Sequence, residues 1–405
     1  MERLVSLVGL CVMIGIAFAL SENKKKIQWR TILTGIGLQV FFGLIILKTD
    51  FGRSIFSTVG KGFNAILGYT GEGAKFLFGS LAVPSDNLGF IFATMVLPTI
   101  IFMSSLMSVL YHLGIMQKVV EVMAKIMMKV MKTSGAESLA AAANIFVGQT
   151  EAPLVIKPYV NLMTKSEIMC LMTGGMATVA GGVLAAYVGF GIDAGHLLAA
   201  SVMSAPAALV CAKLMVPEVE DSATAGVVKI DLPKVADNVI DAAATGASDG
   251  LKLAVNVAAM LLSFIALIAM LNGILGALGG LIGYNQLSFE LIIGYINAPV
   301  AWLLGVPWED CLKVGSILGK KIVLNEFVGY LDLVQNKAQM SERAVTLTTY
   351  ALCGFANFSS IAIQLGGIGT MAPEKRPILA KYGMYSLIGG TLACYMTACI
   401  AGLFI

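Results

Sequence analysis

Two short polar runs stand out in an otherwise apolar chain, and each contains one carboxylate. In "GQTEAP" (148–153), Glu151 lies between glycine and proline neighbours, and in "NEF" (325–327), Glu326 follows an asparagine. Carboxylates, amides and hydroxyls together accept and donate hydrogen bonds to a neutral solute with hydroxyl or amide groups. An anionic solute is disfavoured, because no arginine, the usual bidentate partner of carboxylate and phosphate, lies close to either run.

Further amides and hydroxyls lie in these runs and in two glycine-rich apolar segments. They are Gln149, Thr150, Thr178, Asn325, Asn357, Ser359 and Ser360. Sugars and nucleosides both match this set of groups. Lys320 and Lys321 precede the second run by a turn or two, and we expect them to face an aqueous vestibule.

The composition places these polar runs in a membrane protein. Of 405 residues, 58% are hydrophobic and 13% charged, with a mean hydropathy of +0.86, whereas soluble domains carry about 25% charged residues. A net charge of +3 without a basic patch interleaved with aromatics argues against a nucleic-acid partner. We therefore expect an all-α integral membrane protein.

About eight apolar runs approach the ~20 residues that a membrane-spanning helix needs. They lie near 4–20, 32–48, 89–111, 167–190, 194–216, 250–277, 343–369 and 379–405. Positive charge collects in four loop clusters: Lys24, Lys25, Lys26 and Arg30; Lys118, Lys125, Lys129 and Lys132; Lys213, Lys229 and Lys234; Lys375, Arg376 and Lys381. The positive-inside rule then predicts a multi-pass protein of the inner cell membrane with both termini outside.

Two segments are too short to cross the bilayer twice and too apolar to be loops. Ser134–Met163 and Glu309–Gln339 each have a polar tip between arms of roughly 15 Å, half the hydrocarbon thickness. Each is followed by an apolar span that glycines and small polar residues interrupt. The loop charges predict that the two segments enter from opposite faces, as re-entrant hairpins of an inverted repeat.

The remaining segments complete the predicted organisation. Lysines and apolar residues alternate at helical spacing in 115–133, which indicates an interfacial helix. The predicted divisions are scaffold helices with an external segment (1–114), the inner interfacial helix (115–133), a first transport repeat (134–216), a cytoplasmic loop (217–249), a scaffold span with a following helix (250–306) and a second transport repeat (307–405).

Paired, interrupted segments at matching places in two halves are typical of the central site of a transporter. Non-helical backbone at membrane depth is tolerated only where protein buries it or where it lines a watery cavity. The alternative is that Glu151 and Glu326 are hydrated interfacial carboxylates. An intramembrane enzyme using both carboxylates, and a channel, are the rival functions. No H-E-x-x-H motif or Cys/His nucleophile pairing supports the enzyme.

A second ligand is indicated beside the first tip. The amide of Asn144, the hydroxyl of Thr178 and carbonyls of unwound backbone near Val179 would form an uncharged oxygen cage of the kind that discontinuous helices offer to sodium. The alternative is that both side chains bond to a neighbouring helix.

At these residues the chain resembles the concentrative nucleoside transporter family and its bacterial members. The matching stretches are "AAANIFVGQTEAPLV", "GGMATVAGGVLAAY", "NEFVGY" and "ALCGFANFSSIAI". The resemblance implies a homotrimer that imports a uridine-like nucleoside by an elevator movement, coupled to sodium. A proton-coupled transporter is the alternative.

The resemblance also implies the roles of individual residues. The nucleobase would be held by Gln149, Thr150 and Glu151, with Val183 and Phe355 packing nearby, and the ribose by Glu326, Asn357 and Ser360. Sodium would be held by the side chains of Asn144 and Thr178 and by the carbonyls of Val147 and Val179. No role is predicted for Gln364.

Overall fold

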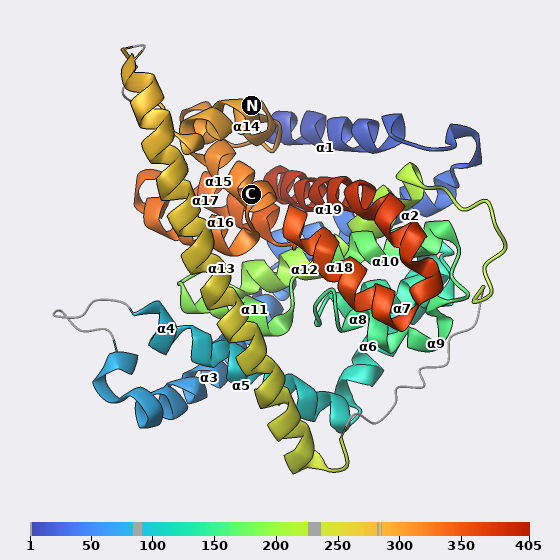
Figure 1. The fold of residues 1–405 in the computed structure, drawn as a ribbon. Helices are drawn as coiled ribbons and strands as arrows, with labels where there is room; N and C mark the ends of the chain where they lie inside the picture. Colours follow the sequence, from blue (N-terminus) through green and yellow to red (C-terminus); the bar gives the residue numbers. More distant parts are fainter. Residues whose placement is uncertain (1, 84–90, 226–235, 282, 285) are drawn as a thin grey trace.

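The computed structural model describes residues 2–83, 91–225, 236–281, 283–284 and 286–405 (Figure 1). The described residues form α-helices and short 3-10 turns, with no strand among them, so the predicted all-α class is confirmed. Seven helical stretches within these ranges are long and apolar enough to cross a membrane: 2–19, 29–48, 92–112, 165–189, 194–215, 239–281 and 373–404. The span at 343–369, predicted to be interrupted, is divided into two helices that are each too short to cross alone, so the number of crossings stays a prediction.

The N-terminal part supplies helices that pack around the rest. They are α1 (Glu2–Ala19), α2 (Trp29–Lys48), α3 (Asp50–Phe78), α4 (Phe92–Met95), α5 (Leu97–His112) and α6 (Ile115–Met131). Helix α6 buries Val120, Ala124 and Met127 on one face, which agrees with the amphipathic pattern of the predicted interfacial helix.

Helix α3 was not foreseen, because its glycine-rich sequence has the composition of a loop. Thr49 caps it by accepting a hydrogen bond from the Gly52 N–H at 2.9 Å. A Cβ at Gly60 would lie 3.3 Å from the backbone nitrogen of Gly195. At this position glycine therefore serves close helix packing rather than a turn.

The same order of elements occurs twice in the chain. The first set consists of α7 (Gly135–Asn144), α8 (Ala152–Val155), α9 (Lys157–Val160), α10 (Lys165–Ala177), α11 (Gly181–Gly189) and α12 (Ala194–Met215). The second consists of α15 (Cys311–Val323), α16 (Glu326–Asn336), α17 (Glu342–Leu352), α18 (Phe358–Met371) and α19 (Arg376–Phe404). Each set has a pair of short arms around a polar tip, then a broken span, then a long helix.

The two broken spans cross at their breaks. The N–H of Phe355 donates to the carbonyl of Thr178 at 3.2 Å. A Cβ at Gly354 would lie 2.8 Å from the carbonyl oxygen of Met176, closer than a side chain tolerates. The backbones can therefore approach only because residue 354 is glycine.

Between the two sets lie α13 (Val239–Leu281) and α14 (Phe289–Leu303), and α13 runs diagonally along one side of the molecule (Figure 1). The predicted loop 217–249 is wrong from Val239 onward, where α13 begins. Asn238 caps this helix by accepting from the N–H groups of Ile240 and Asp241 at 3.0 Å. The segment is rich in alanine, a strong helix former, and its polarity concealed the helix.

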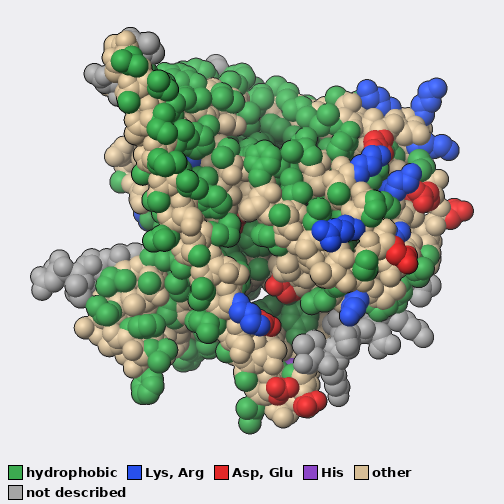
Figure 2. All heavy atoms as spheres, in the orientation of Figure 1, with side chains coloured by type: hydrophobic (Ala, Val, Ile, Leu, Met, Phe, Trp, Pro, Cys, Tyr) green, Lys and Arg blue, Asp and Glu red, His purple; other side chains and the backbone are tan. Residues whose placement is uncertain are grey.

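Most of the charged side chains visible in Figure 2 gather at one end of the molecule, at the right of the view. Lys381 pairs with Glu22 at 3.2 Å, and Lys165 pairs with Glu220 at 3.5 Å. These contacts join segments that are distant in sequence: the start of α19 to the loop after α1, and the first residue of α10 to the loop after α12. Lys229 and Lys234 lie outside the described residues.

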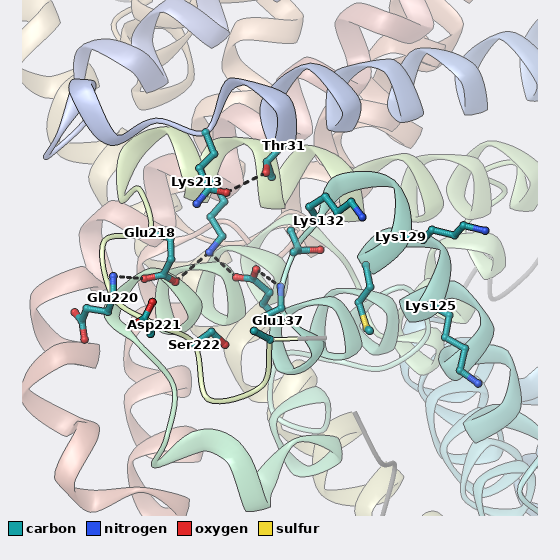
Figure 3. Close-up of a pocket in the computed structure, with 15 residues that line it drawn as sticks. Thr31, Lys125, Lys129, Lys132, Glu137, Lys213, Glu218, Glu220, Asp221 and Ser222 are labelled. Atoms are coloured by element: carbon teal, nitrogen blue, oxygen red, sulfur yellow. Dashed lines mark hydrogen bonds and ion pairs between the residues drawn. The ribbon is translucent and has the colours of Figure 1, made fainter. Parts of the chain in front are cut away.

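A buried ion cluster holds this charged end together (Figure 3). The Nζ of Lys213, on α12, lies 2.7 Å from Oε2 of Glu137 and 3.4 Å from Oε2 of Glu218, and it donates to the Ser166 hydroxyl at 3.0 Å. Lys213 and Glu137 are 9% and 2% exposed, so both charges are largely buried and compensate each other. The cluster joins the first turns of α7 and α10 to α12, beside a cavity of about 450 Å³.

Replacing Lys213 by Ala should destabilise the fold, because Glu137 would remain buried without its counter-charge. Breaking a buried ion pair from one side costs about 3 kcal/mol or more. Thermal unfolding of the detergent-purified protein measures the loss. The matched control is Lys252→Ala, whose pair with Asp249 is 74% and 64% exposed, and equal losses in both variants would contradict a stabilising role for the cluster.

Candidate functional site

A cavity of about 150 Å³ lies between the two polar tips. All eight residues predicted to contact the solute line it: Gln149, Thr150, Glu151, Val183, Glu326, Phe355, Asn357 and Ser360. Both polar tips and both broken spans contribute to its wall. The fold therefore brings together residues that are up to about two hundred positions apart in the chain.

The first tip is fixed by backbone contacts. The carbonyl of Phe146 accepts from the N–H of Gly181 at 3.0 Å, which attaches the tip to the break between α10 and α11. A Cβ at Gly148 would collide with Oε2 of Glu151, so glycine leaves the room that this carboxylate occupies. Glu151 is exposed to the cavity and available to a ligand.

The second tip carries the more enclosed carboxylate. Glu326 is 4% exposed. Its Oε1 accepts from the Tyr187 hydroxyl at 2.9 Å and its Oε2 from the Asn357 amide at 3.0 Å. Each oxygen keeps a second lone pair, so the carboxylate is held in place and can still accept from ligand hydroxyls.

Two asparagine side chains cap the helices that begin at this side of the site. Asn325 caps α16 by accepting from the Val328 N–H at 2.9 Å. Asn357 caps α18 by accepting from the Ser360 N–H at 3.0 Å, and it also accepts from the Ser359 hydroxyl at 2.7 Å. The caps satisfy N-terminal N–H donors of the two helices that begin at the cavity wall.

Sequence reasoning missed part of the wall. Helix α13 contributes Leu253, Val257, Met260 and Leu261. Apolar residues at helical spacing can line a cavity or contact lipid, and their spacing does not distinguish the two. Tyr187 was also missed, although it lies in one of the matching motifs. A buried tyrosine hydroxyl needs a partner, and here that partner is Glu326.

The expectation that both lysines before the second tip face a vestibule is wrong for Lys321. This residue is 0% exposed and donates to the carbonyl of Ala351 at 2.8 Å, near the C-terminus of α17, where carbonyls without helical partners favour a cation. Lys320 pairs with Asp332 at 2.9 Å and Glu290 at 3.5 Å. Neither lysine lines the cavity.

The residues predicted to hold sodium fit an uncharged cation site. Asn144 is 1% exposed, and neither its Nδ2 nor its Oδ1 has a protein partner within the described residues. A Cβ at Gly174 would lie 3.0 Å from Nδ2. The Thr178 hydroxyl donates to the Gly174 carbonyl at 2.9 Å, which leaves its oxygen lone pairs free. Val147 and Val179 are outside the helices, so their carbonyls are not engaged in helical hydrogen bonds.

Comparison with known proteins supports one family across the chain. The family model described as Na+ dependent nucleoside transporter C-terminus matches residues 196–402, the corresponding N-terminus model matches residues 8–81, and a nucleoside recognition Gate model matches residues 93–194.

Similar proteins cover the whole chain. An uncharacterized transporter of Bacillus subtilis, YutK, is 48% identical over 100% of both chains. Sodium/nucleoside cotransporter 1 of Mus musculus is 44% identical over 99% of this chain and 64% of its own length. The structure of CNTnw in an inward-facing substrate-bound state has a TM-score of 0.95 at 44% identity, and it covers 100% of this chain and 98% of that one. The chain therefore belongs to the family of sodium-dependent nucleoside transporters.

Proposed function

We propose that the cavity between the two tips binds a uridine-like nucleoside, which this chain imports together with sodium. Members of this family are transporters, so the intramembrane enzyme is removed as an alternative. The observation that carries the proposal is Glu326, a nearly buried carboxylate that Tyr187 and Asn357 hold at the wall of the cavity. A ligand with paired hydroxyl donors matches its free lone pairs.

The cavity offers separate surfaces for the two parts of a nucleoside. Glu326 and Asn357 would accept from and donate to the ribose hydroxyls. The tip residues Gln149, Thr150 and Glu151 would bind the base, with Val183 and Phe355 against its rings. Ser360 joins the two surfaces, since its hydroxyl accepts from the Gln149 amide at 2.9 Å.

Alternating access would proceed as an elevator movement. In this proposal the two repeats, 134–216 and 307–405, carry the solute against the scaffold of 1–114 and 250–306. Structures of CNTnw in inward-facing and outward-facing states match this chain with TM-scores of 0.95 and 0.94, so the fold is one that has been observed in both states.

Exposed surfaces support the proposed assembly and orientation. Only 11% of an apolar 18-residue stretch of α13 is buried within the chain. This leaves a large apolar surface for lipid and for other copies in a homotrimer. The charged end would face the cytoplasm of a cell whose inner membrane holds the protein, with both termini outside.

Native mass spectrometry should give the mass of three chains, and a monomer mass would count against the trimer.

Purified protein in liposomes should accumulate radiolabelled uridine when an inward sodium gradient is applied. Uptake should collapse when potassium replaces sodium. A pH gradient without sodium should not restore it, whereas uptake driven by protons alone would favour the proton-coupled alternative. No accumulation of any nucleoside under either gradient would refute the proposed function.

Removing the hydroxyl of Thr178 tests the proposed sodium site. Thr178→Val keeps the shape but removes the oxygen, so the sodium concentration for half-maximal uptake should rise by roughly tenfold or more, as loss of a buried polar ligand predicts. Asn144→Ala should have the same effect. The matched control is Thr178→Ser, which keeps the hydroxyl and should retain sodium dependence. Unchanged dependence in Thr178→Val and Asn144→Ala would move the site elsewhere.

The ribose assignment predicts a selective effect of Glu326→Gln. Hydrogen bonds to a charged group contribute about 1.5–3 kcal/mol, so uridine binding should weaken by roughly tenfold to a hundredfold. Binding of 2′,3′-dideoxyuridine should change little, because it lacks the donors. Calorimetry with both ligands measures the ratio, with Glu121→Gln on the exposed side of α6 as control. Equal losses for both ligands would refute the assignment.

A further inference from the structure

Gln364 lies behind the site rather than in it. It is on α18, is 1% exposed and does not line the cavity. Its Nε2 donates to the backbone carbonyl of Met172 at 3.0 Å and to Oε1 of Gln149 at 3.1 Å. Gln364 thus joins the second repeat to the tip residue that we assign to the base.

The orientation of both amides follows from the backbone carbonyl at the end of this chain of bonds. A carbonyl only accepts, so the Gln364 atom that faces Met172 must be the nitrogen. The two hydrogens of that nitrogen are then used, one on Met172 and one on Gln149. The Gln149 atom that faces Gln364 is therefore its oxygen.

This order determines what the cavity wall can donate. With its oxygen on Gln364, Gln149 has its nitrogen on the side of Ser360, a residue that lines the cavity, and donates to the Ser360 hydroxyl at 2.9 Å. Among the described residues, no hydrogen bond uses the second N–H of Gln149 or the hydroxyl hydrogen of Ser360, although the Ser360 oxygen also keeps one lone pair. Both free groups are donors.

The packing leaves little freedom for another arrangement. A Cβ at Gly175 would lie 2.8 Å from both Gln364 Nε2 and Gln149 Cβ. Both glutamine side chains therefore pack closely against Gly175. Oε1 of Gln364 has no hydrogen-bond partner among the described residues. When Gln364 Nε2 donates to Met172 and Gln149, its Oε1 is left as a buried acceptor without a partner.

We propose that Gln364 is a positioning residue that fixes the Gln149 amide with its nitrogen on the cavity side, so that the site selects bases presenting a hydrogen-bond acceptor there. A pyrimidine carbonyl oxygen is such an acceptor. This inference rests on the proposed function and adds the polarity of the base contact. Gln364 acts through Gln149 and does not touch the ligand.

The test replaces Gln364 by Met and measures base and ribose discrimination separately. Dissociation constants of the full-length protein in sodium are measured for uridine, 2-thiouridine, 4-thiouridine and 3′-deoxyuridine. Sulfur is a weaker acceptor than oxygen, so the wild type should bind one of the two thio analogues about fivefold to tenfold more weakly than uridine. In Gln364→Met this ratio should fall below about twofold, while the ratio of 3′-deoxyuridine to uridine stays at its wild-type value.

Gln39→Met is the matched control. Gln39 is 0% exposed and donates to the Thr397 hydroxyl at 2.9 Å, and its Oε1 has no hydrogen-bond partner in the part of the chain that the structure describes. Gln39 does not line the cavity. Both ratios should be unchanged in this variant. Gln149→Met breaks the same bond from the other side and should abolish the thio discrimination as Gln364→Met does, which keeps the proposal testable if one variant does not fold.

The outcomes separate this inference from the proposed function. A wild-type protein that binds no nucleoside refutes the proposed function itself. A protein that binds uridine and both thio analogues equally, or whose thio ratio survives in Gln364→Met, overturns the inference alone. A parallel loss of base and ribose discrimination also overturns it, because Gln364 would then support the site only in general.

Discussion

The structure depends on one constraint: backbone that leaves the helical state at membrane depth must find its hydrogen-bond partners inside the protein. The chain breaks its helices at the two tips and at the two interrupted spans. The first tip and the second span both bond to the break between α10 and α11, through the Phe146 carbonyl and the Phe355 N–H. The breaks thus supply hydrogen-bond partners to one another.

Side chains satisfy backbone groups that the contacts between the breaks leave without a partner. Asn325 and Asn357 cap the two helices that begin at the cavity, and Asn357 also holds Glu326. Glycines at 148, 174 and 354 leave space where a Cβ would press on a carboxylate, an amide or a carbonyl. Polar satisfaction and close packing are therefore met by the same few positions, which also bring the two repeats together.

Much of this arrangement could be predicted from the sequence, because half-length arms, polar tips and interrupted spans are strong signals within an apolar chain. The eight residues expected at the solute lie around one cavity; their roles in binding stay predictions. The wall from α13 could not be predicted, since Leu253 and Val257 resemble any residues that face lipid. The roles of Gln364 and Lys321 were also hidden, because each depends on a partner that is distant in the sequence.

The bond from the Phe355 N–H to the Thr178 carbonyl has a thermodynamic consequence. Thr178 belongs to the proposed cation site and Phe355 to the wall of the solute cavity, so one peptide contact joins the two. If an ion at the proposed site orders the first break, this contact would also order the second, and the solute would then meet a wall that is already in its bound form. By reciprocity the solute would then increase the affinity for the ion by the same factor, so that binding of either one would favour binding of the other.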